Sequence, residues 1–177
     1  KGNLKYKAFF INEEPYISLD TLNLEDDSFV PTISESYYLR PSYVEEQSIN
    51  FIYERFNKNG HFGLVFHATN FSVHDGQGDY GFYGYIVGFK NGLLTVDHVN
   101  YGLSRIYDKP IPLEMDKVYN LKATLKDSLL KVYLNDKLLF ETTLDYYDVY
   151  GSCGVYQNEY AKVKLFGYNK SETILKE

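Results

Sequence analysis

Apolar and polar residues alternate with a period of two along most of the chain after residue 48. In segment 118–126, Tyr119, Leu121, Ala123 and Leu125 alternate with polar neighbours. This period is typical of β-strands that bury one face. The same pattern predicts further strands in segments 49–56, 61–68, 80–89, 93–99 and 161–169. No window of a dozen residues repeats apolar positions at helical spacing, so we expect few or no helices.

Turn signals connect these segments. The stretch LLKVYLNDKLLFETT, residues 129–143, predicts a β-hairpin that turns at Asn135-Asp136-Lys137. Lys90-Asn91-Gly92 and the stretch NKNG, residues 57–60, predict two more turns between consecutive strands. Short connections favour antiparallel pairing, and a lone hairpin is only marginally stable in water. We therefore predict an all-β fold, a two-sheet antiparallel β-sandwich.

The domain organisation is simple. Segment 12–36 is less regular, with acidic pairs and two prolines, and we expect strands with long surface connections there. We find no internal repeat and no low-complexity linker, so residues 1–177 form one predicted domain. The sequence begins with Lys rather than Met, so we expect a mature product or, as the leading expectation, a domain taken from a larger protein.

Composition narrows the kind of partner. The chain has 18 Lys and Arg against 24 Asp and Glu, a net charge of −6. Nucleic acids and anionic lipids favour a positive surface, so we expect a neutral ligand instead. The 19 tyrosines can line a wet site as well as a core. No apolar run approaches the length of a membrane span. The single Cys153 excludes an internal disulfide and is expected to be a small buried residue.

One glycine-rich stretch raises the question of a metal. HDGQGDYG, residues 74–81, places Asp75, Gln77 and Asp79 at alternate positions, and oxygen ligands in such a turn can hold calcium. The EF-hand pattern fails, because Tyr80 occupies its glycine position. A solvated loop is the alternative. Asp75 and Asp79 are the metal candidates, and no cofactor is expected to be required.

Three stretches resemble the concanavalin A-like jelly roll. They are INFIYERFNKNGHFGLVFHA (49–68), GYIVGFKNGLLTVDHV (84–99), and VYNLKATLKDSLLKVYLNDKLLFET (118–142) followed by DVYGSCGVYQNEYAKVKLF (148–166). They look most like the family 66 carbohydrate-binding modules appended to fructan-degrading enzymes, and laminin-G-like modules share much of the pattern. Two positions differ from the family. His67 stands where the family often has Arg. After the Gly-x-x-Gly turn, where the family has an aromatic residue that is often Trp, this chain has Tyr156. The resemblance implies a jelly roll and, in many members, a structural calcium.

Catalytic patterns are missing from the sequence. The glucanases of this fold carry Glu-x-Asp-x-(x)-Glu carboxylates on one strand, and no such run occurs here. Glu45 and Glu46 are adjacent, so within a strand they are expected to point to opposite faces. A carboxylate dyad assembled from distant strands stays open, because catalytic geometry need not be local in sequence. We expect a binding module rather than an enzyme.

Sugar sites combine an aromatic face with side chains that hydrogen-bond to hydroxyls. Within this pattern His67 is expected to face outward, and Tyr83 and Tyr85 to share a strand face. The residues from Tyr156 onward follow the Gly-x-x-Gly turn, where the resemblance implies part of the binding surface. The expected ligand-binding residues are Tyr38, Arg40, His67, Asp79, Tyr83, Tyr85, Asp97, Tyr101, Arg105, Tyr156, Gln157 and Glu159.

Our leading hypothesis is a non-catalytic carbohydrate-binding module, outside the cell or at its surface. It would target an attached enzyme or surface protein to a glycan, such as fructan or another oligosaccharide end. One alternative is a laminin-G-like protein-interaction or adhesin domain, which should expose an apolar patch. A further alternative is a glycoside hydrolase of the same fold, which needs two carboxylates about 5–10 Å apart in a groove.

Overall fold

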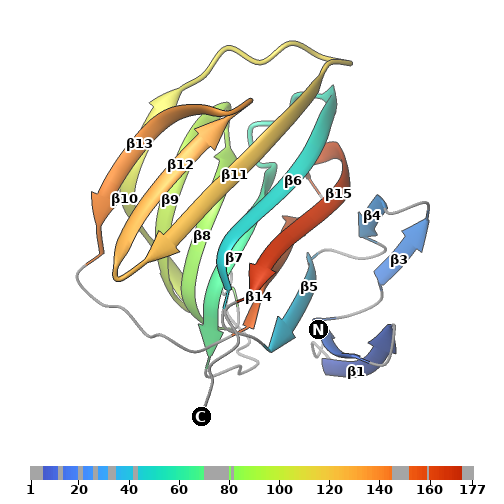
Figure 1. Cartoon of the computed structure of the whole chain (residues 1–177). Coiled ribbons are helices and arrows are strands. Elements are labelled where there is room, and N and C mark those ends of the chain that lie inside the picture. Colours follow the sequence, from blue (N-terminus) through green and yellow to red (C-terminus); the bar gives the residue numbers. More distant parts are fainter. Residues whose placement is uncertain are drawn as a thin grey trace.

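The computed structural model describes residues 6–11, 14–19, 22–25, 28–31, 35–41, 44–69, 80, 82–144, 152–158 and 160–172, with side chains in 45–68, 80, 82–144, 153–158 and 160–171. Its regular elements are β-strands in two antiparallel sheets that pack face to face (Figure 1). This architecture confirms the predicted β-sandwich. In the part of the chain that the structure describes, no helix could cross a membrane.

Each sheet mixes strands from distant parts of the sequence. The eight-stranded sheet has the order β1-β2-β5-β14-β7-β8-β9-β10 and the seven-stranded sheet the order β13-β12-β11-β6-β15-β4-β3. The strands of the first are β1 (Tyr6–Ile11), β2 (Glu14–Leu19), β5 (Glu35–Pro41), β14 (Ser152–Asn158), β7 (His61–Thr69), β8 (Tyr83–Lys90), β9 (Leu93–Asn100) and β10 (Gly102–Pro110). The strands of the second are β13 (Lys137–Thr143), β12 (Leu129–Leu134), β11 (Val118–Lys126), β6 (Val44–Arg55), β15 (Lys162–Glu172), β4 (Ser28–Pro31) and β3 (Leu22–Glu25).

The predicted hairpins at 90–92 and 135–137 are both present. Asn135 and Asp136 have φ angles of 49° and 64°, and Asn91 and Gly92 have 53° and 71°. Positive φ at both central residues is the type I′ geometry, whose twist matches that of the flanking strands. The turn between β11 and β12 has the same geometry, with 49° at Asp127 and 64° at Ser128.

The predicted pairing across residues 57–60 is wrong. β6 lies in the seven-stranded sheet and β7 in the eight-stranded sheet, so this short turn is a corner between the sheets. Asn158 fixes the corner: its Oδ1 accepts from the His61 backbone N–H at 3.0 Å, and its Nδ2 donates to the Asn59 carbonyl at 2.9 Å. Turn length alone cannot distinguish a hairpin from such a corner, because both need only a few residues.

The main core lies between the two sheets and is rich in aromatic rings. The Phe51 ring lies 5.1 Å from Phe62, 5.3 Å from Phe89 and 5.4 Å from Tyr119, centroid to centroid. Cys153 is buried in this core, as the sequence predicted. The buried Gln47 crosses the interior, where its amide donates to the Val65 carbonyl at 2.9 Å. A buried amide needs such a partner.

The outer face of the eight-stranded sheet carries a second buried cluster. Its members are Val65, Ala68, Tyr80, Phe82, Ile86, Val99 and Tyr156. Every residue of β8 between its two ends is therefore buried. β11 of the seven-stranded sheet alternates instead between buried and more exposed residues. The outer face of the seven-stranded sheet therefore keeps solvent-facing polar side chains, such as Thr124, along its inner strands.

Candidate functional site

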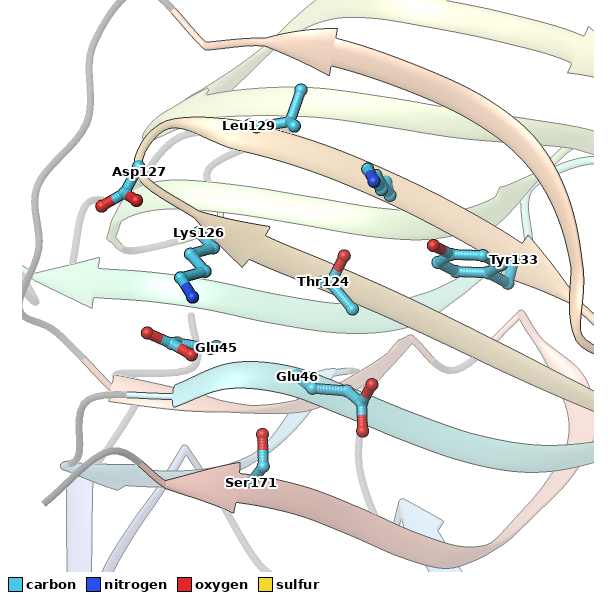
Figure 2. A pocket seen from close by; sticks show the side chains of 9 residues that line it. Glu45, Glu46, Thr124, Lys126, Asp127, Leu129, Tyr133 and Ser171 are labelled. Atoms are coloured by element: carbon cyan, nitrogen blue, oxygen red, sulfur yellow. The ribbon is translucent and has the colours of Figure 1, made fainter.

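A groove of about 550 Å³ lies on the outer face of the seven-stranded sheet (Figure 2). Small-ligand sites fall in the range of about 300–1,000 Å³, so the groove can hold a ligand of that size. The strands β6, β11 and β12 supply most of its surface, and β15 supplies one margin. Its lining residues are Glu45, Glu46, Thr124, Lys126, Asp127, Leu129, Lys131, Tyr133 and Ser171.

Strand alternation and register bring these side chains together. On β11, Ala123 and Leu125 point into the core, so Thr124 points outward into the groove. Register places Ser171 opposite Glu46, Glu46 opposite Thr124, and Thr124 opposite Lys131. We call these residues the polar row: Ser171, Glu46, Thr124 and Lys131. The row crosses β15, β6, β11 and β12 at right angles to the strands.

Glu45 and Glu46 both line the groove, so the expectation that they face opposite sides is wrong. The pairing of β15 with β6 is irregular here: Ser171 lies opposite Glu46, but the next residue, Glu172, lies opposite Val44. One residue of β6 is therefore extra, as in a β-bulge, and a bulge breaks the strict alternation of faces. The sequence carries no signal for this bulge.

Tyr133 is the aromatic wall of the groove. The Lys122 ammonium lies 4.7 Å from the centre of its ring and 3.6 Å from the Asp136 carboxylate. Figure 2 shows Tyr133 at one end of the groove and Lys126 and Asp127 at the other. The ring therefore stands beside carboxylates that accept hydrogen bonds, ammonium groups that donate them and hydroxyls that do both.

Two sequence-predicted residues, Asp97 and Arg105, meet on the other sheet. They lie opposite each other on β9 and β10, with Arg105 Nε 2.7 Å from Asp97 Oδ1. Arg105 also donates to Asp108 at 3.1 Å. Burial raises the pKa of the Asp97 carboxyl, and Arg105 and Thr95 offset part of that rise. Burial lowers the pKa of Arg105, but its bonds to Asp97 and Asp108 outweigh burial and raise it.

His61 lies on the same face as Asp97 and was not among the predicted residues. Its Nδ1 is 3.1 Å from the Tyr80 hydroxyl, and its ring packs against Tyr156 at 5.1 Å. Burial, with the positive charges of Lys90 and Arg105, lowers the pKa of His61 to about 3. The imidazole is therefore neutral at physiological pH and acts as a packed polar group. His61 stands out only through its contacts in the tertiary structure, such as that with Tyr80, because no local sequence pattern singles it out.

The outward placement expected for His67 is wrong, because its side chain is 1% exposed. Against β8, β7 skips from Phe66 to Thr69, and this bulge removes the alternation on which the expectation rested. Tyr156 and Gln157 lie within β14 in the middle of the sheet and are buried, rather than on a surface turn. The Gln157 amide donates to the carbonyls of Ala161 and Val163.

Three predicted tyrosines have mainly structural surroundings. Tyr85 belongs to the core between the sheets. Tyr83 and Tyr85 do share a strand face, since their rings lie 4.8 and 5.1 Å from the His98 ring. Tyr101 is half-buried, and its backbone N–H donates to the Phe82 carbonyl. The rings of Tyr83 and Tyr85 thus lie in packing contacts, and the part of all three tyrosines in ligand binding stays a prediction.

The remaining predicted residues fall outside the described side chains. Tyr38 and Arg40 belong to β5, whose backbone pairs with β14, and only that backbone is described. Asp75, Asp79 and Glu159 lie outside the described residues. Within the described part of the chain, no group of three or more His, Cys, Asp or Glu side chains could hold a metal. The calcium site stays a prediction.

None of the groove residues was singled out from the sequence as ligand-binding. They are the ordinary polar positions of alternating strands, and such residues are usually only solvated. Their significance comes from a register that combines four strands and from the bulge beside Glu45. A signal was present only in part: the hairpin 129–143 placed Lys131 and Tyr133 on one strand face.

The fold is that of a lectin-like jelly roll. It is similar to the carbohydrate-binding module CBM66 from Bacillus subtilis, with a TM-score of 0.63 and 18% identity over 86% of this chain and 91% of that one. The potassium-bound carbohydrate recognition domain of Emp46p is also similar, with a TM-score of 0.63 and 14% identity over 90% of this chain and 89% of that one. For Trypanosoma rangeli sialidase, the TM-score is 0.55 and the identity 13%, over 88% of this chain and 26% of the sialidase chain. No family model and no curated protein matches the sequence.

Proposed function

We propose that this chain is a non-catalytic carbohydrate-binding module that holds a glycan in the groove of the seven-stranded sheet. The observation that carries the proposal is the groove itself, which sets the Tyr133 ring beside acceptor and donor side chains on a lectin-like sandwich. A tyrosine ring can pack against the C–H face of a sugar, and flanking polar groups can bond to its hydroxyls. Two of the similar structures bear names of carbohydrate-binding domains, which supports the same role.

The groove suits this role better than the face that carries Asp97 and Arg105. Asp97 is fully buried and already bonded to Arg105, while His61 is buried against Tyr80. A ligand there would have to displace side chains packed in the second buried cluster. The groove residues contact solvent, so a sugar can reach them without rearranging the sheet. We therefore assign glycan binding to the groove.

The biological setting follows from the proposed role. We expect the domain to be one part of a larger protein, residues 1–177 forming a single module, and to act outside the cell or at its surface. Its task there would be to hold an attached enzyme or surface protein on a glycan. Single-site affinity would be modest, and attachment to a polymer would raise the effective affinity through multivalency.

The test is calorimetric titration of the full chain with soluble fructans, β-glucans and host-type oligosaccharides, with and without EDTA, together with an assay for released sugars. We expect saturable binding to one class without turnover. Tyr133→Ala should weaken that binding about tenfold or more, because aromatic residues dominate binding hot spots. Tyr160→Ala, at an exposed tyrosine outside the groove, is the matched control and should bind normally.

Other outcomes would redirect the assignment. Release of sugars that is lost in Glu46→Gln would favour the hydrolase alternative, since three carboxylates, Glu45, Glu46 and Asp127, line the groove. Binding that disappears in EDTA would point to calcium. Failure to bind any glycan would contradict the proposal.

A protein-interaction domain is the second candidate, and one observation favours it. Tyr53, Phe56, Ile111, Leu113 and Met115, with Gly92, surround a small apolar hollow of about 160 Å³ at one end of the sandwich. Phe56 is 56% and Met115 62% exposed. Exposed apolar patches mark interaction sites. If no glycan binds, this hollow becomes the leading site.

A further inference from the structure

We propose that the groove recognises an internal stretch of a linear, uncharged glycan lying across the strands, rather than a chain end. This inference rests on the proposed function and adds the class of ligand and the mode of binding. Its basis is the polar row, Ser171, Glu46, Thr124 and Lys131, together with the Tyr133 ring beside it.

The length of the polar row favours several sugar units. Neighbouring strands lie about 4.8 Å apart, so a row over four strands covers about 14 Å from Ser171 to Lys131. Tyr133 is two residues from Lys131 on the same face of β12, and it extends the lined surface beyond the row. A single terminal sugar would leave most of these polar groups without a partner.

Both ends of the polar row lead to exposed positions. Ser171 is exposed, and beyond Lys131 the next residue across the sheet is the exposed Glu141 on β13. Glu141 lies 3.9 Å from the Lys131 ammonium but does not line the groove. A pocket for a chain end needs a wall against which the last sugar stops. Among the residues that the structure describes, no such wall closes either end of the row, so a glycan chain can continue past Ser171 and past Lys131.

The charges in the groove favour a neutral ligand. Glu45, Glu46 and Asp127 contribute three carboxylates, against two ammonium groups from Lys126 and Lys131. Sulfated or uronic sugars would meet this negative surplus on a chain that already carries −6 overall. Across the row, groups that only accept or only donate alternate with hydroxyls that do both. This order matches the hydroxyl groups of neutral sugars, which also donate and accept.

The experiment is calorimetric titration of the full chain with defined oligosaccharides, from disaccharide to hexasaccharide, derived from linear β-glucans and fructans. A second set has one chain end blocked, and a third is sulfated. We expect affinity to rise about tenfold or more from disaccharide to tetrasaccharide and then level off. Blocking one end should leave affinity unchanged, and sulfation should lower it.

Variants connect this length dependence to the polar row. Thr124→Val and Glu46→Gln should weaken binding of the tetrasaccharide more than binding of the disaccharide. Ser104→Ala, at an exposed serine on the edge strand β10, is the control and should behave as the wild type. Circular dichroism and urea unfolding of each variant show whether it is folded.

Distinct results overturn distinct statements. Binding that is independent of length and lost when one end is blocked would overturn this inference and leave the proposed function standing. Tighter binding of the sulfated set would overturn the assignment of a neutral ligand. No binding by any member would overturn the proposed function and this inference together.

Discussion

The outer faces of the two sheets use polar residues in opposite ways. On the seven-stranded sheet, Glu46, Thr124 and Lys131 stand over a mainly apolar inner face and line an accessible groove. On the eight-stranded sheet, Asp97 and His61 are buried beside apolar residues and are bonded to other side chains. Polar residues on the first face can serve a ligand, whereas those on the second hold the structure together.

This difference shows that a polar residue within an apolar strand is a poor guide to a ligand-binding site. Polar residues such as His67 and Asp97 attract attention in the sequence because they interrupt apolar strands. A polar residue that interrupts an apolar strand is usually buried and must find a partner inside the protein. The regular alternation of β11 and β12 instead leaves their polar side chains on the outer face, outside the core. The groove lies on that face.

The largest expected effect is on the covered sheet, at the glycine pair Gly63 and Gly88. A Cβ at Gly88 would lie 2.0 Å from the Phe62 carbonyl oxygen and 2.5 Å from Gly63 Cα. Gly88→Ala should therefore lower the free energy of unfolding by about 3 kcal/mol or more, because backbone atoms would have to move. Urea denaturation measures this change.

Gly102→Ala is the matched control, since no atom lies within 4 Å of a Cβ at that position. It should change stability by less than about 0.5 kcal/mol. Equal stability of the two variants would show that the close approach at Gly63 and Gly88 is relieved without strain.

A smaller effect is expected from Arg105→Met, which leaves the buried Asp97 carboxylate without its ion pair. Breaking a buried pair costs about 3–5 kcal/mol, and we expect about 2 kcal/mol here because Arg105 is 33% exposed. The pKa of Asp97 is already raised above the ordinary 3.8 by burial. Without Arg105 it should rise further.

The sign of the pH dependence follows from that raised pKa. The folded state then binds the Asp97 proton more readily than the unfolded state, so stability is lost as pH rises through the raised value. The deficit of Arg105→Met should accordingly be full at pH values above the raised pKa of Asp97 and should shrink as pH falls through it. Urea unfolding at several pH values checks this. Adding Asp97→Asn should remove the pH dependence, and a deficit that is constant with pH would contradict the explanation.

The smallest effects are expected when a threonine is replaced by valine, once on the outer face of each sheet. Thr95→Val removes a buried hydroxyl that donates to the Gly88 carbonyl at 3.4 Å and supports Asp97. It should lower the free energy of unfolding by about 1 kcal/mol and leave glycan affinity unchanged. Thr124→Val in the groove should change stability by less than about 0.5 kcal/mol and weaken binding. The reverse pattern would mean that the ligand face has been placed on the wrong sheet.

Much of the fold could be predicted from the sequence. The alternation located β6 to β9, β11 to β13 and β15, because each strand buries one face or carries enough apolar residues to bury two. β10 was not predicted, since it is an edge strand whose residues are mostly exposed. The candidate site was largely missed. Thr124, Lys126, Lys131 and Tyr133 lay in segments whose alternation assigned them to the outward face, and nothing local marked Glu45 or Ser171.

The sequence by itself determined most of the central strands, the turns of the hairpins and the two-layer sandwich, because these depend on residue period and on local backbone preference. Only the tertiary structure decided which sheet each strand joins, which face is covered, and that the polar row aligns across four strands. Those features depend on pairing between residues such as Glu46, Thr124 and Ser171, which are far apart in the chain. A bulge at Glu45 or at His67 reverses the face of a side chain, and its position is set by the partner strand rather than by the residue itself.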